Sequence, residues 1–202
     1  MSMRRIVNVA ARFWAAGALS ALAAACASSP SSRGGAFPDQ FSSLSLCRGV
    51  VISNAPATDT SRRIANFDPQ ASVRGKRLLR APVKSCVSSG FGPRRGGAGS
   101  FHYGLDLYTG RPALIGAGGD GVVESVGSLR GYGRTVLINH GGGVKTRYAH
   151  LSRYERGLKP GMRVRLGQPI GRTGDTGNAT AVHLHYEIIV DGKRHNPLTV
   201  GG

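Results

Sequence analysis

Five residues that can bind a metal ion or transfer a proton lie in three short motifs of the C-terminal half. His102 and Asp106 begin and end HYGLD, His150 stands in YAHLS, and His183 and His185 form HLH. Imidazole nitrogens and carboxylate oxygens are the usual non-thiolate ligands of zinc, and an imidazole beside the ion can serve as a general acid or base. Three such motifs in one half of the chain favour a metal site over unrelated structural histidines.

The alternation around HLH predicts a strand with two different faces. Residues of equal parity share a face of a strand. The segment therefore has a polar face of His183, His185 and Glu187, and an apolar face of Leu184, Tyr186 and Ile188. On the polar face, Glu187 has two interpretations: it orients a ligand histidine, or it forms a salt bridge at the strand end.

The spacing in HYGLD raises a problem of distance. His102, Gly104 and Asp106 share one strand face, but four residues of straight strand span about 13 Å, whereas bonds to zinc are about 2.0–2.2 Å. Glycine within a strand often marks a bulge or a close approach. We therefore predict a bend at Gly104 that brings His102 and Asp106 to one ion.

Together these motifs resemble the signature of the lysostaphin/LytM-type zinc peptidases, the M23 peptidases, which hydrolyse peptide bonds in peptidoglycan. HYGLD corresponds to their H-x-x-x-D and HLH to their H-x-H. The likeness runs through the C-terminal half, from residues 89–92 through 131–136 and YAHLS to 174–178, and is absent from residues 1–80.

The resemblance implies a role for each of the five residues. His102, Asp106 and His185 correspond to the zinc ligands, and this three-ligand set leaves a fourth position for water. His150 and His183 correspond to the catalytic pair that does not bind the ion. Which of the two takes the proton from water, and which steadies the oxyanion or protonates the leaving amine, stays open.

Short β-like runs broken by glycine follow one another from residue 85 onward. They lie at 121–126, 135–139, 144–148 and 183–190. This pattern predicts an all-β, antiparallel sandwich or barrel-like metallopeptidase domain over residues 85–202. His140 is expected in a hairpin turn and His195 at the surface.

The first 25 residues predict an export signal. Three arginines precede the apolar stretch 13–25, which is too short for a membrane span of roughly 20 residues. Cys26 follows three alanines, as in a bacterial lipoprotein cleavage box, although Ala23 stands where a bulky aliphatic residue is usual. Ordinary cleavage beside Cys26 is the alternative. Both interpretations place the chain in the cell envelope or periplasm, the first with a lipid anchor in a membrane.

Between signal and domain we expect two segments. Residues 26–45 are rich in Ser, Ala, Gly and Pro and predict a flexible tether. Residues 46–84 predict a mostly irregular N-terminal arm with one strand, and the arm contains the short apolar run 49–52. Such an arm could cover the groove and keep an enzyme latent, a hypothesis that fails if its deletion leaves the rate unchanged.

With Cys26 assigned to the anchor, two cysteines remain. Cys47 lies in the arm and Cys86 at the start of the domain. An oxidising compartment permits a disulfide between them, and two unrelated buried thiols are the other interpretation.

The net charge of the chain indicates which classes of binding partner to expect. There are 27 lysines and arginines against 10 acidic residues, a formal net charge of +17. Such a surplus favours an anionic partner. Because no helix-turn-helix, RNP-like or zinc-finger spacing occurs, nucleic acid is not the expected partner. An anionic wall polymer or a membrane surface fits an exported protein better.

The expected function is that of a zinc-dependent endopeptidase that hydrolyses peptide crosslinks of peptidoglycan through a zinc-activated water. One alternative is a catalytically silent LytM-like module that activates a cell-wall amidase, but such relatives lack zinc ligands that this chain retains. Another is a structural wall-binding lipoprotein, which would need a closed four-ligand site. The crosslink that is cut and any regulatory protein partner stay undetermined, and Asn178 and Thr180 either line the groove or are merely solvated.

Overall fold

A computed structural model describes residues 42–52, 54–94 and 101–201. In these ranges the backbone forms strands and no helix, and all pairs of named strands are antiparallel, which confirms the predicted all-β fold. The expected signal peptide, Cys26 and most of the tether lie outside the described residues. Within them, no helix has the length and apolar character needed to cross a membrane.

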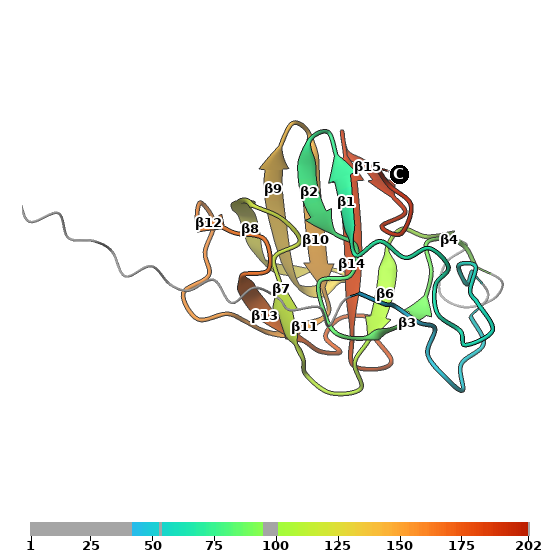
Figure 1. Ribbon diagram of the computed structural model, residues 1–202. Helices are drawn as coiled ribbons and strands as arrows, with labels where there is room; N and C mark the ends of the chain where they lie inside the picture. The colour runs from blue at the N-terminus through green and yellow to red at the C-terminus, as the bar shows by residue number, and fades with distance from the viewer. Residues whose placement is uncertain (1–41, 53, 95–100, 202) are drawn as a thin grey trace, which may run out of the picture. The chain divides into compact units, whose positions relative to one another are not determined.

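One large sheet carries most of the domain (Figure 1). Its strands follow the order β12 (Arg163–Val164), β8 (Gly121–Leu129), β9 (Gly133–Gly141), β10 (Val144–Ala149), β14 (His183–Val190), β6 (Leu105–Tyr108) and β3 (Cys86–Ser89). A further strand, β15 (Lys193–His195), pairs with the C-terminal end of β14. All four runs predicted as strands are strands of this sheet.

Three smaller sheets complete the described fold. One contains β11 (Leu151–Tyr154), β13 (Pro169–Thr173) and β7 (Leu114–Gly116). The others are the hairpin of β1 (Gln70–Val73) with β2 (Lys76–Leu79), and the pair of β4 (Gly92–Pro93) with β5 (Phe101–His102). Figure 1 shows the hairpin in front of the large sheet.

The main core lies on one face of the large sheet. It is the face to which the alternation in β14 predicts that the apolar side chains point. Leu184, Tyr186 and Ile188 are fully buried there. The two tyrosines of this core keep their hydroxyls bonded: Tyr186 donates to the carbonyl of Leu79 at 2.9 Å, and Tyr148 accepts from the amide of Gly118 at 2.5 Å. Burial of large side chains on this face stabilises the strands that carry the polar residues on the other.

The N-terminal arm has more order than expected. The run 49–52 forms no strand, and Val51 is 98% exposed, because no strand among the described residues pairs with this short apolar segment. Instead the arm contributes both strands of the β1–β2 hairpin, whose Leu78 and Leu79 are buried. Two strands, rather than the predicted one, therefore come from residues 46–84.

A disulfide joins the arm to the large sheet. Cys47 and Cys86 form the bond, which confirms the disulfide interpretation over that of two separate thiols. Beside it, Leu46 forms a parallel bridge with Val87 of β3, and the amide of Cys47 donates to the carbonyl of Val87 at 3.0 Å. The arm thus follows the outer edge of β3 before it turns away.

His140 is not the turn residue that the sequence suggested. It is the penultimate residue of β9, and it is 6% exposed. Its ring nitrogens bond the carbonyl of Asp120 at 2.7 Å and the hydroxyl of Thr146 at 2.8 Å. The turn falls on the glycines that follow, because Gly142 and Gly143 adopt positive φ angles of 62° and 77°.

Removal of the disulfide is expected to destabilise the domain substantially. The two cysteines are 39 residues apart, and the chain-entropy model gives about 4 kcal/mol for closing a loop of that length. Denaturant unfolding of the oxidised protein and of the Cys47→Ser/Cys86→Ser double variant measures the difference. Equal unfolding free energies would contradict a stabilising role.

Candidate metal centre

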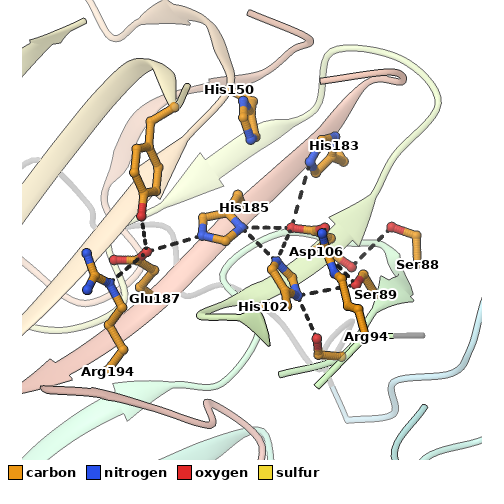
Figure 2. Close-up of polar contacts among 12 residues, drawn as sticks. Ser88, Ser89, Arg94, His102, Asp106, His150, His183, His185, Glu187 and Arg194 are labelled. Atoms are coloured by element: carbon orange, nitrogen blue, oxygen red, sulfur yellow. Dashed lines mark hydrogen bonds and ion pairs between the residues drawn. The ribbon is translucent and has the colours of Figure 1, made fainter. Parts of the chain in front are cut away.

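Three of the predicted site residues meet at one point (Figure 2). His102 ends β5, Asp106 lies in β6, and His185 in β14 pairs directly with Asp106 across the sheet. His102 Nε2 lies 3.0 Å from His185 Nδ1 and 3.0 Å from Asp106 Oδ1. His185 Nδ1 lies 2.8 Å from the same carboxylate oxygen. Two nitrogens and one oxygen therefore form a nearly equilateral triangle.

The predicted bend at Gly104 is present. β5 ends at His102, β6 begins at Leu105, and Gly104 itself is a bend between them. A Cβ atom on Gly104 would lie 2.6 Å from His185 Cε1 and 2.8 Å from the carbonyl of Tyr186. Glycine is therefore needed for the close approach of the His185 ring to this bend.

The donor triangle fits a zinc ion. Bonds of 2.0–2.2 Å in tetrahedral geometry place neighbouring ligand atoms about 3.4 Å apart, so the triangle needs to open by only about half an ångström. His102 and His185 are buried, and Asp106 is nearly so. Two imidazoles and a carboxylate also match the donor chemistry of three-ligand catalytic zinc sites.

Each candidate ligand is held by a second contact on the side away from the triangle. His102 Nδ1 donates to the carbonyl of Gly90 at 2.6 Å. Asp106 Oδ2 accepts from Arg94 at 3.1 Å. His185 Nε2 donates to Glu187 at 3.3 Å. Such outer contacts fix the tautomer and the direction of the ligand atoms.

Glu187 contacts the candidate ligand His185 and also forms salt bridges, but it lies within β14 and not at the strand end that the salt-bridge interpretation assumed. It is completely buried on the polar face of β14, beside His185. Its carboxylate also accepts from Tyr132 at 2.9 Å, Arg147 at 2.9 Å and Arg194 at 3.2 Å. Burial raises its pKa, but the hydrogen bond from His185 and the neighbouring positive charges outweigh burial, so the pKa of Glu187 is lowered. It remains an anion that orients His185.

The triangle favours a positive charge at its centre. Burial opposes ionisation of Asp106, yet hydrogen bonds from His102 and His185 outweigh it and hold the pKa of this carboxyl well below its usual range. Burial lowers the pKa of His185, but its bonds to Asp106 and Glu187 outweigh burial and raise the pKa to about 9. A proton between these groups occupies the place where a cation would bind.

The other two histidines stand beside the triangle without joining it. His150 and His183 have ring centroids 4.7 Å apart, and His183 Nε2 lies 3.8 Å from Asp106 Oδ1. In each ring Nδ1 donates to a backbone carbonyl at 2.7 Å, that of Thr176 for His150 and that of Ala181 for His183. The neutral form of each ring therefore presents Nε2 as a proton acceptor.

Interlocked loops hold His150 in place. Its backbone adopts a φ of 62°, in the left-handed region, at the junction of β10 and β11. The carbonyl that accepts from its ring belongs to Thr176, whose hydroxyl donates to Leu151 and accepts from the amide of Arg134. A Cβ atom on Gly133 would overlap Thr176, which explains the glycine in this connector.

His150 is suited to remain neutral near pH 7. Desolvation by burial lowers its pKa to about 4, and the bond to the Thr176 carbonyl only partly offsets this effect. A neutral imidazole with a free Nε2 can accept a proton from water.

The five residues line a cavity of about 910 Å³. Asn178 and Thr180 also line it, so the loop before HLH does border the groove. The arm residues Arg48, Val50 and Asn54 line it as well. The arm therefore contributes a wall of the cavity.

The sequence did not single out several residues that support the site. Arg94, Ser89 and Asn54 surround the outer side of His102 and Asp106, and Tyr132 and Arg147 surround Glu187. Ser89 and Tyr132 lie in the glycine-containing segments 89–92 and 131–136, which resemble the family. This resemblance was the one feature of the sequence that pointed to them. Nothing in the arm sequence distinguished Asn54.

Comparison with known sequences gives a consistent result. Residues 100–197 match Peptidase family M23. The peptidoglycan DD-endopeptidase ShyC of Vibrio cholerae is 41% identical over 139 residues, which cover 66% of this chain and 32% of ShyC. The chain thus corresponds to about a third of the length of this relative.

Solved structures show the same likeness. A zinc-containing peptidase from Vibrio cholerae matches with a TM-score of 0.56 and 33% identity, over 61% of this chain and 40% of that one. The catalytic domain of lysostaphin from Staphylococcus simulans matches with a TM-score of 0.52 and 31% identity, over 56% of this chain and 89% of that one. The similar region therefore covers most of the lysostaphin catalytic domain.

Zinc binding is expected to release a proton near neutral pH. Because the pKa of His185 is about 9 without an ion, its Nδ1 carries a proton that zinc must displace, and affinity should fall as the pH drops below 9. Calorimetric titration with zinc in buffers of different ionisation enthalpy should give about one proton released per ion. Identical heats in all buffers would contradict this assignment.

Substitution at the bend should disturb the centre directly. Gly104→Ala places a methyl group against His185, so zinc affinity should fall by at least about tenfold, with a loss of stability of about 1–3 kcal/mol. Gly127→Ala is the matched control, because a methyl group there meets open space within β8. Competition with a chromophoric chelator measures both affinities. Equal values for the two variants would argue against the close approach.

Proposed function

Since the chain belongs to peptidase family M23, we propose that it is a zinc-dependent endopeptidase that hydrolyses peptide crosslinks of bacterial peptidoglycan. The observation that carries this proposal is the convergence of His102 Nε2, Asp106 Oδ1 and His185 Nδ1, within 3.0 Å of one another, in a cavity that two further histidines line. His102, Asp106 and His185 are the proposed metal ligands. His150 and His183 are the proposed catalytic residues.

A zinc ion held by this triangle would supply a Lewis acid that polarises the scissile carbonyl and makes water more acidic. The chain supplies the remaining chemistry. The Glu187 carboxylate binds His185 Nε2 and so keeps His185 Nδ1 directed at the centre of the triangle. The Gly90 carbonyl binds His102 Nδ1 and so keeps His102 Nε2 directed at the same point. Asp106 brings one negative charge to the centre.

The histidine pair handles protons. Both rings have Nδ1 bonded to a carbonyl, so Nε2 of each is free to accept a proton from water and return it to the leaving amine. The low pKa of His150, about 4, keeps this ring neutral before the reaction. Once protonated, either imidazole becomes a hydrogen-bond donor for the oxyanion.

The substrate choice rests on the relatives and on the cavity. ShyC is named a DD-endopeptidase, which supports a directly linked D-amino-acid crosslink rather than a glycine bridge as the substrate. The exposed rings of Phe101 and Tyr103 lie at the border of the cavity, with centroids 4.8 Å apart. They offer apolar surface beside the metal centre for the stem peptide.

The setting that we propose is the cell envelope. The export signal at residues 1–25 and lipidation at Cys26 would place the enzyme in the periplasm on a membrane anchor, with residues 26–45 as tether. The domain boundary at residue 85 is part of the same proposal, with the arm at 46–84. Removal of the signal takes away three arginines, so 24 lysines and arginines remain against 10 acidic residues, and this net charge of +14 favours association with anionic envelope components.

Product analysis tests the function. The chain from residue 27 onward is incubated with purified peptidoglycan and zinc, and new peptide ends are identified by mass spectrometry. We expect cleavage at crosslinks by the unchanged chain and none by His185→Ala, because loss of one of three ligands removes the ion. His195→Ala, a histidine outside the cavity lining, is the control that should retain activity.

The outcome also separates the alternatives. Zinc binding without cleavage would contradict the proposal of an active endopeptidase and favour a latent enzyme or a module that activates a separate amidase. Cleavage that persists in His185→Ala would contradict the metal assignment.

A further inference from the structure

One residue of the N-terminal arm reaches the outer side of the metal centre. Asn54 lies in the arm, before the region that matches the family at residues 100–197, and it borders the cavity. Its side chain contacts the backbone amide and the backbone carbonyl of Gly90, and the same carbonyl receives the bond from His102.

The contact between Asn54 and Gly90 is a two-point pairing. Asn54 Oδ1 accepts from the amide of Gly90 at 3.0 Å, and Asn54 Nδ2 donates to the Gly90 carbonyl at 2.5 Å. The side-chain amide thus takes the place that a neighbouring strand would occupy. A Cβ atom on Gly90 would overlap the backbone carbonyl of Asn54, so only glycine allows the two segments to approach this closely.

The pairing fixes the direction of the Gly90 carbonyl. That oxygen accepts two bonds, one from Asn54 Nδ2 and one from His102 Nδ1 at 2.6 Å. With Nδ1 donating, the lone pair of His102 lies on Nε2, the atom in the donor triangle. Ser89 Oγ also lies 3.2 Å from Nδ1, but this hydroxyl rotates and already accepts from Arg94.

We propose that Asn54 is a positioning residue for the metal centre: through Gly90 it holds the tautomer and orientation of His102. The inference rests on the proposed metal site and extends it to the arm. Asn54 does not touch the ion or the substrate in this role. It acts through one intervening peptide group.

A disulfide and a hydrogen bond hold the arm beside Gly90, as a positioning role for Asn54 requires. The Cys47–Cys86 disulfide ties it to β3 only a few residues before Gly90. Arg62, farther along the arm, donates to the carbonyl of Cys47 at 2.8 Å. Asn54 therefore sits on a segment fixed at the edge of the same strand that leads to Gly90.

The positioning role and the latency hypothesis predict opposite effects when the arm is disrupted. An inhibitory arm would raise activity when it is disrupted, whereas a positioning arm lowers metal affinity when its contact is lost. The measurement of choice is therefore zinc affinity, which does not depend on whether the protein hydrolyses peptidoglycan.

The test compares two asparagines of the same arm. Zinc affinity is measured by chelator competition for the unchanged protein, Asn54→Ala and Asn66→Ala, and thermal unfolding of each zinc-free protein is recorded. We expect about a tenfold weaker affinity for Asn54→Ala, in the range usual for outer contacts of zinc ligands. Asn66 is exposed and outside the cavity lining, so Asn66→Ala should bind zinc as the unchanged protein does.

A spectroscopic readout separates positioning from general stability. Long-range ¹H–¹⁵N NMR of the unchanged protein should show the His102 proton on Nδ1, and Asn54→Ala should show a mixture of tautomers. Unaltered zinc affinity in a folded Asn54→Ala protein would overturn the proposal. So would an Nε2-protonated His102 in the unchanged zinc-bound protein, a result that needs no variant to fold. Altered affinity with no crosslink cleavage by the unchanged protein would leave the proposal intact and refute only the endopeptidase function.

Discussion

Three electron-rich atoms that face one another within 3.0 Å impose the main constraint on this structure. His102 Nε2, His185 Nδ1 and Asp106 Oδ1 would repel one another without a proton or a cation between them. The fold holds them there by backbone pairing: β6 and β14 are neighbours in the large sheet, with Asp106 and His185 in register. The bend at Gly104 then returns His102 to the same point.

The surroundings of the triangle are arranged in successive layers of hydrogen bonds. Glu187 holds His185, and it is in turn held by Tyr132, Arg147 and Arg194. The Gly90 carbonyl holds His102. A buried anion such as Glu187 is costly unless it is paired, and here one of its partners is the candidate ligand His185 itself. Charge compensation and orientation of the site are therefore achieved by the same contacts.

Much of this arrangement follows from local patterns in the sequence. Alternation in HLHYEI gave the two faces of β14, and the distance argument in HYGLD required the bend at Gly104. Both depend on residues that are adjacent in the chain. The family resemblance added the pairing of His102 and Asp106 with His185, which lies 79 residues beyond Asp106.

The features that the sequence did not indicate are contacts over long separations. Asn54 and Gly90 are 36 residues apart, and no spacing rule relates a single asparagine in an irregular arm to a glycine before β4. His140 looked like a turn residue because three glycines follow it, yet bonds to Asp120 and Thr146 keep it inside the strand. The β1–β2 hairpin likewise depends on packing against the large sheet, because its own alternation is short.

The most direct test of the central claim is to locate the ion. Crystals grown with zinc, measured on both sides of the zinc absorption edge, give an anomalous difference map that identifies the metal and its position. The account predicts one strong peak about 2.0–2.2 Å from His102 Nε2, Asp106 Oδ1 and His185 Nδ1, with His150 and His183 outside bonding distance. A peak ligated by His150 or His183, or no peak at the triangle, would contradict it.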